Sequence, residues 1–437
     1  MEEALGETVV SQWQLARSAN IPWEPPMHKG ELMLFKERYA MQELLGVGGF
    51  GTVHRAIHCS TGTEVAVKTI CFAADEQSKS TQRIELEIQA MCKCSNPLII
   101  SVIEAFVPNL GVGDRKGEFV WQIVLELCSG RDLFQIIEER GALEPEALRA
   151  VTAQLAVAVL HMHSRGVVHR DLKPSNIMVL GGELQGALTN IQLIDFGIAH
   201  ILGDSFVSKY EASLTKHTRT WMQKKSSIEK GDFQCPGADQ HPDTTSRTWK
   251  QKLVEMEKLY SPMKSYPIEK LFSPMKSYQV SPSSTPSKTY FSATAKGTQG
   301  YSAPEVRPNP GNTQRNASDG VSTIEIPVSS DAFSIGITIR QCATGVPPDE
   351  DLADYISMQT MSLPAVIMNL WRRCHGKPIA KFRFISQLPQ EVRTIIKCLT
   401  ETSVEKRMTI TQLCQTSFVA DAPGSYGNPF GKSVAML

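Results

Sequence analysis

A glycine-rich hexapeptide near the start of the chain has the composition of a phosphate-binding loop. Residues 46–51 read Gly-Val-Gly-Gly-Phe-Gly and match the pattern GxGxxG. Without side chains at the glycines, the backbone is free to approach phosphate oxygens closely. Dinucleotide-binding folds use the same pattern between a strand and a helix, and an ordinary hairpin turn is a third possibility. Because β-prone residues 52–58 follow the glycines, the sequence favours a strand–turn–strand flap over phosphates.

A lysine lies on the next apolar strand, in the segment Val65-Ala66-Val67-Lys68. A lysine that is held among apolar side chains needs an anionic partner. The helix predicted around 78–94 supplies Glu85 and Glu87, and this argument alone leaves both carboxylates open.

Three further motifs combine charged, amide and glycine residues in a fixed order. Residues 169–176 read His-Arg-Asp-Leu-Lys-Pro-Ser-Asn, residues 195–197 read Asp-Phe-Gly, and residues 302–305 read Ser-Ala-Pro-Glu. Together with the glycine-rich loop and Lys68, these motifs resemble those of a eukaryotic protein kinase domain of the serine/threonine type. The resemblance runs in family order from Leu45 to Arg407 and covers most of the chain.

The resemblance implies phosphoryl transfer from ATP to protein serine or threonine hydroxyls, and it assigns the catalytic residues. Lys68 would hold the α- and β-phosphates and would be braced by Glu87, which has the family's usual spacing to Pro97. Asp171 would accept or orient the substrate hydroxyl proton, and Lys173 would steady the γ-phosphate. Such a reaction depends on positioning and charge neutralisation.

The same resemblance predicts a magnesium site and a substrate class. Asn176 and Asp195 would ligate Mg²⁺, a hard cation that takes oxygen ligands. Lys173 in place of the alanine or arginine patterns of tyrosine kinases favours serine/threonine specificity. Thr298 fits this interpretation, because the position typically contacts Asp171 and Lys173.

The expected ATP site includes the glycine-rich loop, an adenine sandwich and a hinge. Val53, Ala66 and Met178 would sandwich the adenine, Leu125 would be the gatekeeper, and the backbone of Glu126 to Cys128 would be the hinge. The full set of predicted nucleotide-binding residues is Leu45, Gly46, Val47, Gly48, Gly49, Phe50, Gly51, Thr52, Val53, Ala66, Lys68, Leu125, Glu126, Cys128 and Met178. A structural pair between Glu305 and Arg407 is also implied, and Phe333 stands where the family has tryptophan.

Composition narrows the partners. Lysine plus arginine and aspartate plus glutamate each total 45 in 437 residues, so a global affinity for nucleic acid or for anionic membranes has no support. The ten cysteines include no CxxC pair, which argues for reduced thiols rather than a zinc site. With neither a signal peptide nor a long apolar stretch in the sequence, we expect a cytoplasmic or nuclear protein without a membrane partner.

The predicted fold class is α+β, a two-lobed protein kinase-like fold. A tail is expected over 1–32 and a kinase domain over 35–420. The small antiparallel sheet lobe with one helix would span about 35–127 and the larger, mainly helical lobe about 131–420, with ATP in the cleft between them. A second tail would occupy 421–437.

A long polar insertion interrupts the segment between the Asp-Phe-Gly and Ala-Pro-Glu motifs. Residues 205–294 are rich in Ser, Thr, Pro and Lys and are expected to be a disordered basic insert. An upstream proline-directed kinase is a possible partner, because four residues precede proline, namely Ser261, Ser273, Ser281 and Thr285. Thr294 lies three residues before Gly297, where kinases with an arginine in the His-Arg-Asp motif commonly take an activating phosphate, and Arg170 would be its cationic partner. The insert is either a neutral flexible insertion or, as a functional hypothesis, a basic segment that binds an acidic partner or occludes the substrate groove.

Two alternatives accompany the active-kinase interpretation. A pseudokinase scaffold would keep the fold and act by contacts, but Lys68, Asp171, Asn176 and Asp195 are all present. A nucleotide-binding oxidoreductase is disfavoured because a strand rather than a helix is predicted after the glycines. His161 and His163 lie on one helical face and are expected to be packed histidines rather than metal ligands.

Overall fold

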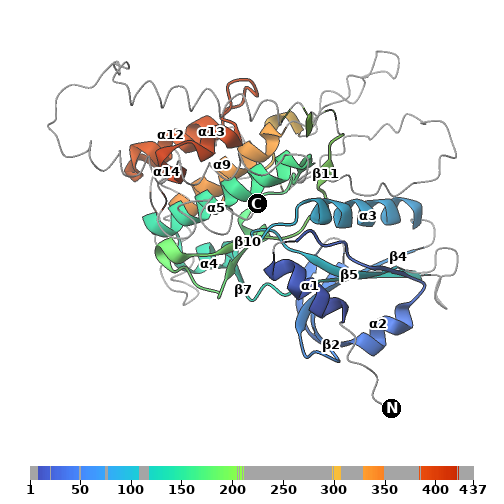
Figure 1. Ribbon diagram of the computed structural model, residues 1–437. Coiled ribbons are helices and arrows are strands. Elements are labelled where there is room, and N and C mark those ends of the chain that lie inside the picture. Colours follow the sequence, from blue (N-terminus) through green and yellow to red (C-terminus); the bar gives the residue numbers. More distant parts are fainter. Residues whose placement is uncertain are drawn as a thin grey trace, which may run out of the picture.

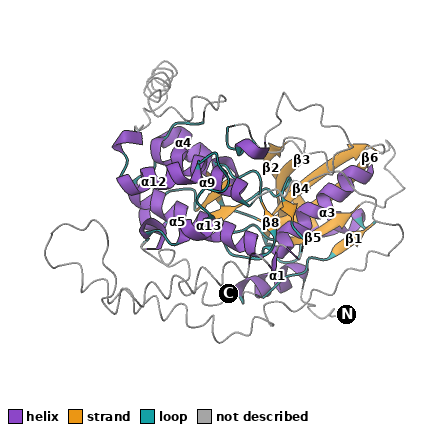
Figure 2. Cartoon of the chain, turned by 90° about the horizontal axis from the view of Figure 1, so that it is seen from above, coloured by secondary structure: helices purple, strands orange, loops and turns teal. Residues whose placement is uncertain are grey.

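The computed structural model describes those parts of the chain that form its two lobes. It covers residues 8–19, 21–48, 51–73, 77–107, 118–203, 300–306, 328–348 and 385–420, together with 205, 207, 208, 210, 298, 383 and 422. Figure 1 shows a sheet-rich N-terminal lobe beside a mainly helical C-terminal lobe, and in Figure 2 the strands of the large sheet lie on the side opposite most of the helices. The predicted two-lobed α+β fold is confirmed.

A six-stranded sheet forms the N-terminal lobe, in the order β1-β5-β6-β4-β3-β2. Its strands are β1 (Met27–Lys29), β2 (Tyr39–Gly48), β3 (Gly51–His58), β4 (Glu64–Ala73), β5 (Val102–Val107) and β6 (Glu118–Glu126). Strands β2 and β3 form an antiparallel hairpin in which Gly48 pairs with Gly51. A strand therefore follows the glycine-rich turn, as expected for a flap and not for a dinucleotide-binding fold.

Alternate residues of the sheet supply two separate apolar layers, because successive side chains of a strand point to opposite faces. On β4, Ala66 and Ile70 belong to the main core, whereas Val65 and Val67 belong to a second cluster. Helix α3 (Gln77–Lys93) packs its buried residues into the main core. This helix lies on one face of the sheet and leaves the other face to be covered.

The N-terminal segment covers that other face, which corrects the expected tail over 1–32. Helix α1 (Val9–Ser18) starts at Thr8, whose side chain accepts a hydrogen bond from Ser11 N at 3.1 Å. Val10 and Trp13 of α1 are buried in the second cluster. Strand β1 pairs in parallel with β5, so the sheet also gains a parallel strand that the sequence did not predict. The apolar patterns of α1 and β1 are too short to be recognised from the sequence alone.

A buried carboxylate holds the next part of this segment. Glu104 of β5 is fully buried. It accepts hydrogen bonds from Tyr39, from His28 Nε2 at 2.7 Å and from Arg38 Nη1 at 2.7 Å, the last at the end of helix α2 (Leu32–Arg38). Because a buried charge is costly unless it is paired, these three contacts tie β1 and α2 to the sheet.

The C-terminal lobe is built on two buried helices. Helix α5 (Pro145–Ser164) buries the apolar stripe expected from its sequence. Helix α9 (Ser329–Thr344) is buried along nearly its whole length. A Cβ atom at Gly336 would lie 2.7 Å from the Leu399 side chain, so glycine permits close packing against the neighbouring helix. Among the described residues, the other α-helices of this lobe are α4 (Leu133–Arg140), α12 (Gln390–Leu399), α13 (Ile410–Cys414) and α14 (Ser417–Ala420).

Short strands at the lobe boundary position the charged motifs. Strands β7 (Gly130–Asp132), β9 (Ile177–Leu180) and β10 (Ile191–Leu193) form one small sheet, and β8 (Val167–Val168) pairs with β11 (His200–Ile201). The His-Arg-Asp motif lies between β8 and β9, and the Asp-Phe-Gly motif follows β10. Four 3₁₀ turns complete the elements of the described chain, η2 (Pro174–Asn176), η3 (Gly186–Leu188), η5 (Pro304–Val306) and η6 (Ile385–Gln387).

Several predictions from the sequence concern residues that lie outside the described part of the chain. The basic insert at 205–294 lies outside the described residues except at four positions, and the tail at 421–437 except at residue 422. Within the described part of the chain, no helix is long and apolar enough to cross a membrane.

Candidate active site

The loop that carries Asp171 is held by hydrogen bonds from its backbone to the carboxylate of Asp331 on α9. Its Oδ2 accepts a hydrogen bond from His169 N and its Oδ1 from Arg170 N, both at 2.9 Å, while His163 Nε2 lies 2.9 Å from Oδ2. Burial would raise the pKa of Asp331, but the hydrogen bond and charge of His163 and the backbone donors outweigh it and lower the pKa. His163 is thus a packed histidine, as expected, and the ionised Asp331 fixes the loop backbone.

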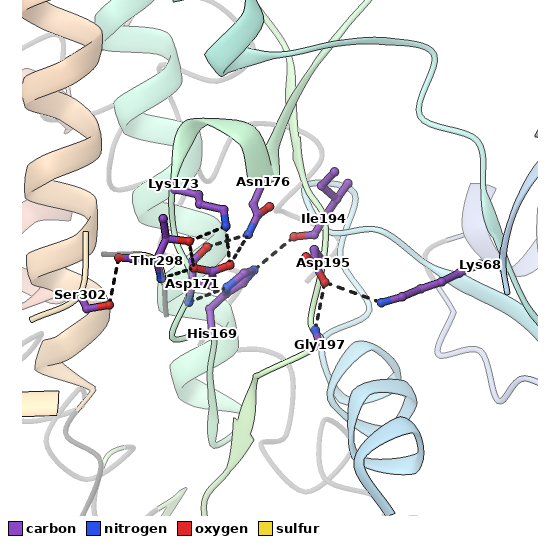
Figure 3. Close-up of polar contacts among 10 residues, drawn as sticks. All are labelled: Lys68, His169, Asp171, Lys173, Asn176, Ile194, Asp195, Gly197, Thr298 and Ser302. Carbon is purple, nitrogen blue, oxygen red and sulfur yellow. Dashed lines mark hydrogen bonds and ion pairs between the residues drawn. The ribbon is translucent and has the colours of Figure 1, made fainter. Parts of the chain in front are cut away.

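Asp171 lies in a cluster of donors that Figure 3 shows from several elements. Lys173 Nζ donates to its Oδ2 at 2.8 Å, and Thr298 donates to its Oδ1 through both N, at 3.0 Å, and Oγ1, at 2.8 Å. Asn176 Nδ2 donates to Asp171 O at 2.8 Å and to Oδ2 at 3.2 Å. Lys173 Nζ also donates to Thr298 Oγ1 at 2.5 Å. Although burial opposes ionisation, these donors lower the pKa of Asp171, so its carboxylate is charged at neutral pH.

Lys68 is paired inside the N-terminal lobe. Its Nζ lies 2.5 Å from Glu87 Oε1 of α3 and 3.7 Å from Asp195 Oδ1. Burial alone would lower the pKa of Lys68, but the charges of Glu87 and Asp195 prevail and raise it. Glu87 is buried and Glu85 is exposed. The structure therefore pairs Lys68 with Glu87, the carboxylate that the resemblance favoured, and not with Glu85.

Asp195 occupies a strained backbone position between the two groups. Its φ is +62°, in the left-handed region that residues other than glycine rarely adopt. Its Oδ1 accepts a hydrogen bond from Gly197 N at 3.2 Å, and its side chain is 40% exposed. In Figure 3 the side chain lies between Lys68 and the group around Asp171. An exposed carboxylate in this place is available to a cation.

The donor set fits a magnesium ion that completes its coordination with substrate. Among the residues described, no group of three or more His, Cys, Asp and Glu side chains forms a metal cluster on its own. Mg²⁺ usually binds one or two carboxylates together with water and phosphate oxygens. Asn176 turns its amide nitrogen to Asp171, and in Figure 3 its oxygen points away from that residue. Asn176 and Asp195 thus offer one amide oxygen and one carboxylate.

Three of the predicted adenine-binding residues fall on neighbouring strands of the six-stranded sheet, and the fourth, Met178, is on β9 of the small sheet. Ala66 of β4 is paired with Leu125 of β6, and Val53 of β3 is paired with Lys68. Ala66 and Leu125 are buried, and Val53 packs against the same core. Met178 on β9 is half-buried. The structure thus brings the strands of the predicted sandwich into one core, while the nucleotide roles remain predictions.

The glycine-rich loop is described in part, and Gly49 and Phe50 lie outside the described residues. A Cβ atom at Gly51 would meet Thr69 O at 2.1 Å, and the φ of Gly51 is +143°, so this position requires glycine. Leu45 and Val47 are exposed, with 49% and 74% of their surface accessible. Exposed apolar side chains on this glycine-rich hairpin are compatible with contact to a nucleotide.

The predicted pair of Glu305 and Arg407 is present in the C-terminal lobe. Arg407 donates to Glu305 through Nη1 at 2.5 Å and Nη2 at 3.0 Å. Phe333, in place of the family's tryptophan, is buried, and the Arg407 guanidinium lies over its ring with 5.1 Å between Cζ and the centroid. The aromatic substitution therefore keeps a packed contact at this point.

The sequence did not predict that the side chain of Glu126 makes buried contacts within the domain. The sequence assigned only its backbone to the hinge, yet its carboxylate is held by Arg17, Ser101 and Gln192. Arg17 lies 109 positions away, and nothing in the expected tail marked it as a partner.

Two lobes joined after β6, with a paired lysine on one and an aspartate-centred loop on the other, define a domain of the protein kinase type. The family model described as "Protein kinase domain" matches residues 39–223. The chain contains a protein kinase domain.

Similar proteins carry kinase names. Over 161 residues the chain is 37% identical to "Sperm motility kinase 3A" of Mus musculus, covering 37% of this chain and 28% of that protein. It is 34% identical over 185 residues to "Probable serine/threonine-protein kinase fhkD" of Dictyostelium discoideum, covering 42% and 22%. With "NUAK family SNF1-like kinase 1" of Homo sapiens the values are 34% over 174 residues, 40% and 24%. The chain spans less than a third of the length of these curated relatives.

Proposed function

We propose that this chain is a protein kinase that transfers the γ-phosphoryl group of ATP to serine or threonine hydroxyls of proteins, with Mg²⁺ as its metal. The observation that carries the proposal is the shared cluster of Asp171, Lys173 and Thr298, opposite the pair of Lys68 and Glu87. These are the groups needed to orient a hydroxyl and to neutralise phosphate charge.

The residues around Asp171 orient the incoming hydroxyl. Asp171 is charged and is fixed at Oδ1 by Thr298 and at Oδ2 by Lys173. As a carboxylate it accepts the hydrogen bond of the substrate hydroxyl, and Lys173, two positions further, places a positive charge beside the transferred group. Preorganised charges of this kind stabilise a transition state without rearranging during the reaction.

The residues around Lys68 hold the donor. Lys68 keeps its proton because Glu87 and Asp195 raise its pKa, so it remains a cation for the α- and β-phosphates. Asn176 and Asp195 would hold Mg²⁺, which neutralises phosphate charge when bound. Asp195 can bind a cation without leaving Lys68 unpaired, because the Glu87 carboxylate lies 2.5 Å from the lysine.

The alternative is a scaffold that keeps this fold and does not turn over. Purified chain and its Asp171→Asn variant are incubated with labelled ATP, Mg²⁺ and a generic basic protein. Labelling by the wild type alone supports the proposal. No labelling by either protein favours the scaffold, and equal labelling by both contradicts the role of Asp171.

We further propose that phosphorylation of Thr294 activates the kinase. Arg170, the partner expected from the sequence, is described, and Thr294 itself lies outside the described residues. In protein shown by mass spectrometry to carry the phosphate in the wild type, Thr294→Ala lowers the rate. An unchanged rate contradicts this. The proline-directed sites at Ser261, Ser273, Ser281 and Thr285 are tested by the same mass spectra.

A further inference from the structure

Helix α1 sends one charged side chain to the connection between the lobes. Arg17, in its last turn, donates from Nη2 to Glu126 Oε1 at 2.7 Å. The same guanidinium donates to Asn96 O at 2.9 Å and to Ile99 O at 3.1 Å. Arg17 thus joins the loop that follows α3 to the end of β6.

Glu126 needs this contact because its carboxylate is largely withdrawn from water. Its side chain is 12% exposed, and burial raises its pKa even though Arg17 and other donors oppose that change. Ser101 N donates to Oε1 at 3.1 Å, and Gln192 Nε2 donates to the same atom. Arg17 is the cation paired with this carboxylate within the described residues. Without a cation, the carboxylate would be buried with neutral donors alone, an arrangement that is costly.

The network reaches both ends of the proposed nucleotide site. Glu126 begins the predicted hinge, and its backbone N donates to Ser101 O at 3.0 Å. Gln192 of β10 accepts a hydrogen bond from Cys128 Sγ at 2.8 Å and lies three residues before Asp195. Two hinge residues are therefore fastened to strand β10, which ends two residues before the proposed metal ligand Asp195.

Helix α1 is itself rigidly seated, so Arg17 is a fixed support. Trp13 Nε1 donates to Ser101 Oγ at 3.0 Å, and Val10 and Trp13 are buried against the sheet. A side chain that is held by packing and by three acceptors presents its charge at one place.

We propose that Arg17 is a positioning residue for nucleotide binding: it neutralises Glu126 and thereby sets the backbone of the hinge over residues 126–128. This inference rests on the proposed function for its nucleotide, and it makes the N-terminal helix part of the kinase site. We do not assign Arg17 a contact with substrate, and its proposed effect passes through Glu126.

The test is a double-mutant cycle in the full chain, with Arg17→Gln, Glu126→Gln and both together. Gln14→Ala is the control, because Gln14 is on the exposed side of the same helix and makes one contact of 3.4 Å to Thr63. Dissociation constants for a fluorescent ATP analogue with Mg²⁺ are measured by titration. Hydrogen exchange of the hinge amides is measured without nucleotide.

We expect Arg17→Gln to weaken analogue binding roughly tenfold, the size of one lost charge-assisted hydrogen bond, and to accelerate exchange at 126–128. The change should appear in KM for ATP more than in kcat. Adding Glu126→Gln should restore most of the loss, because no buried charge then lacks a partner. Gln14→Ala should match the wild type.

Two results would overturn the inference. One is an Arg17→Gln protein with unchanged hinge exchange. The other is a double variant that is no better than Arg17→Gln, including the case in which the whole sheet exchanges faster, since that indicates a general loss of stability. If the wild type binds no nucleotide, the proposed function fails, and the exchange data still decide the role of Arg17.

Discussion

Replacing Glu87 by glutamine removes the nearer of two charges that hold Lys68. Lys68 Nζ lies 2.5 Å from Glu87 and 3.7 Å from Asp195. In the Glu87→Gln variant, Asp195 is the one of these two residues that still offers Lys68 a carboxylate. We expect Lys68 to shift toward Asp195 and to compete with Mg²⁺ for it.

The magnitude follows from these distances. At an effective dielectric constant of about 20, the Coulomb attraction is roughly 7 kcal/mol for the 2.5 Å contact and roughly 4 to 5 kcal/mol for the 3.7 Å contact, before desolvation. The glutamine keeps a neutral acceptor, so the net loss is the difference between a charge-assisted and a neutral hydrogen bond, about 1 to 2 kcal/mol. That corresponds to a roughly 5- to 30-fold fall in kcat/KM for ATP.

Steady-state phosphorylation at varied ATP and Mg²⁺ measures this fall. Glu87→Gln should also need a higher Mg²⁺ concentration for half-maximal rate. Glu85→Gln is the matched control, because it makes the same change at an exposed position of the same helix. Equal losses in the two variants, or an unchanged Mg²⁺ requirement in Glu87→Gln, would contradict the role of Glu87 in holding Lys68.

Three more predictions concern other parts of the domain. Glu305→Ala leaves the fully buried Arg407 side chain without its carboxylate and should lower the free energy of unfolding by about 3 kcal/mol; a loss below about 1 kcal/mol in urea titration contradicts this. Thr298→Ala removes a hydroxyl donor to Asp171 and should lower kcat roughly tenfold, with Thr298→Ser restoring it; an equal effect of both variants is the contrary result. The pKa of Asp331 is depressed below its ordinary value of 3.8, so its contribution to stability is present above that value and is lost as pH falls through the folded-state pKa. Urea unfolding as a function of pH should therefore show a weaker acid dependence in Asp331→Asn, and an unchanged slope excludes the linkage.

The sequence predicted the parts of the fold that have a local signal. The hairpin around the glycine-rich loop follows from β-prone residues on both sides of a turn, and the buried face of α5 follows from its helical period. The motifs around Asp171 and Asp195 were recognised because their residue types are close together in the chain. The need for an anionic partner did not by itself distinguish Glu85 from Glu87, because that choice depends on how α3 is rotated against β4. The resemblance favoured Glu87 through its spacing to Pro97.

The features that the sequence missed depend on distant partners. Helix α1 buries only Val10 and Trp13, a stripe of one turn that is too short to stand out. Strand β1 is three residues long and pairs with β5, so that Met27 lies opposite Ala105. The contact of Arg17 with Glu126 likewise exists only after the sheet has formed.

The reaction proposed for this chain is phosphoryl transfer to aliphatic hydroxyls, directed by Asp171. The most direct measurement incubates the chain with labelled ATP, Mg²⁺ and peptide pools that differ only in a central serine, threonine or tyrosine. We expect label on the serine or threonine pools, and none when Asp171 is replaced by asparagine. Label confined to tyrosine, or no label on any pool from folded, nucleotide-bound protein, would contradict it.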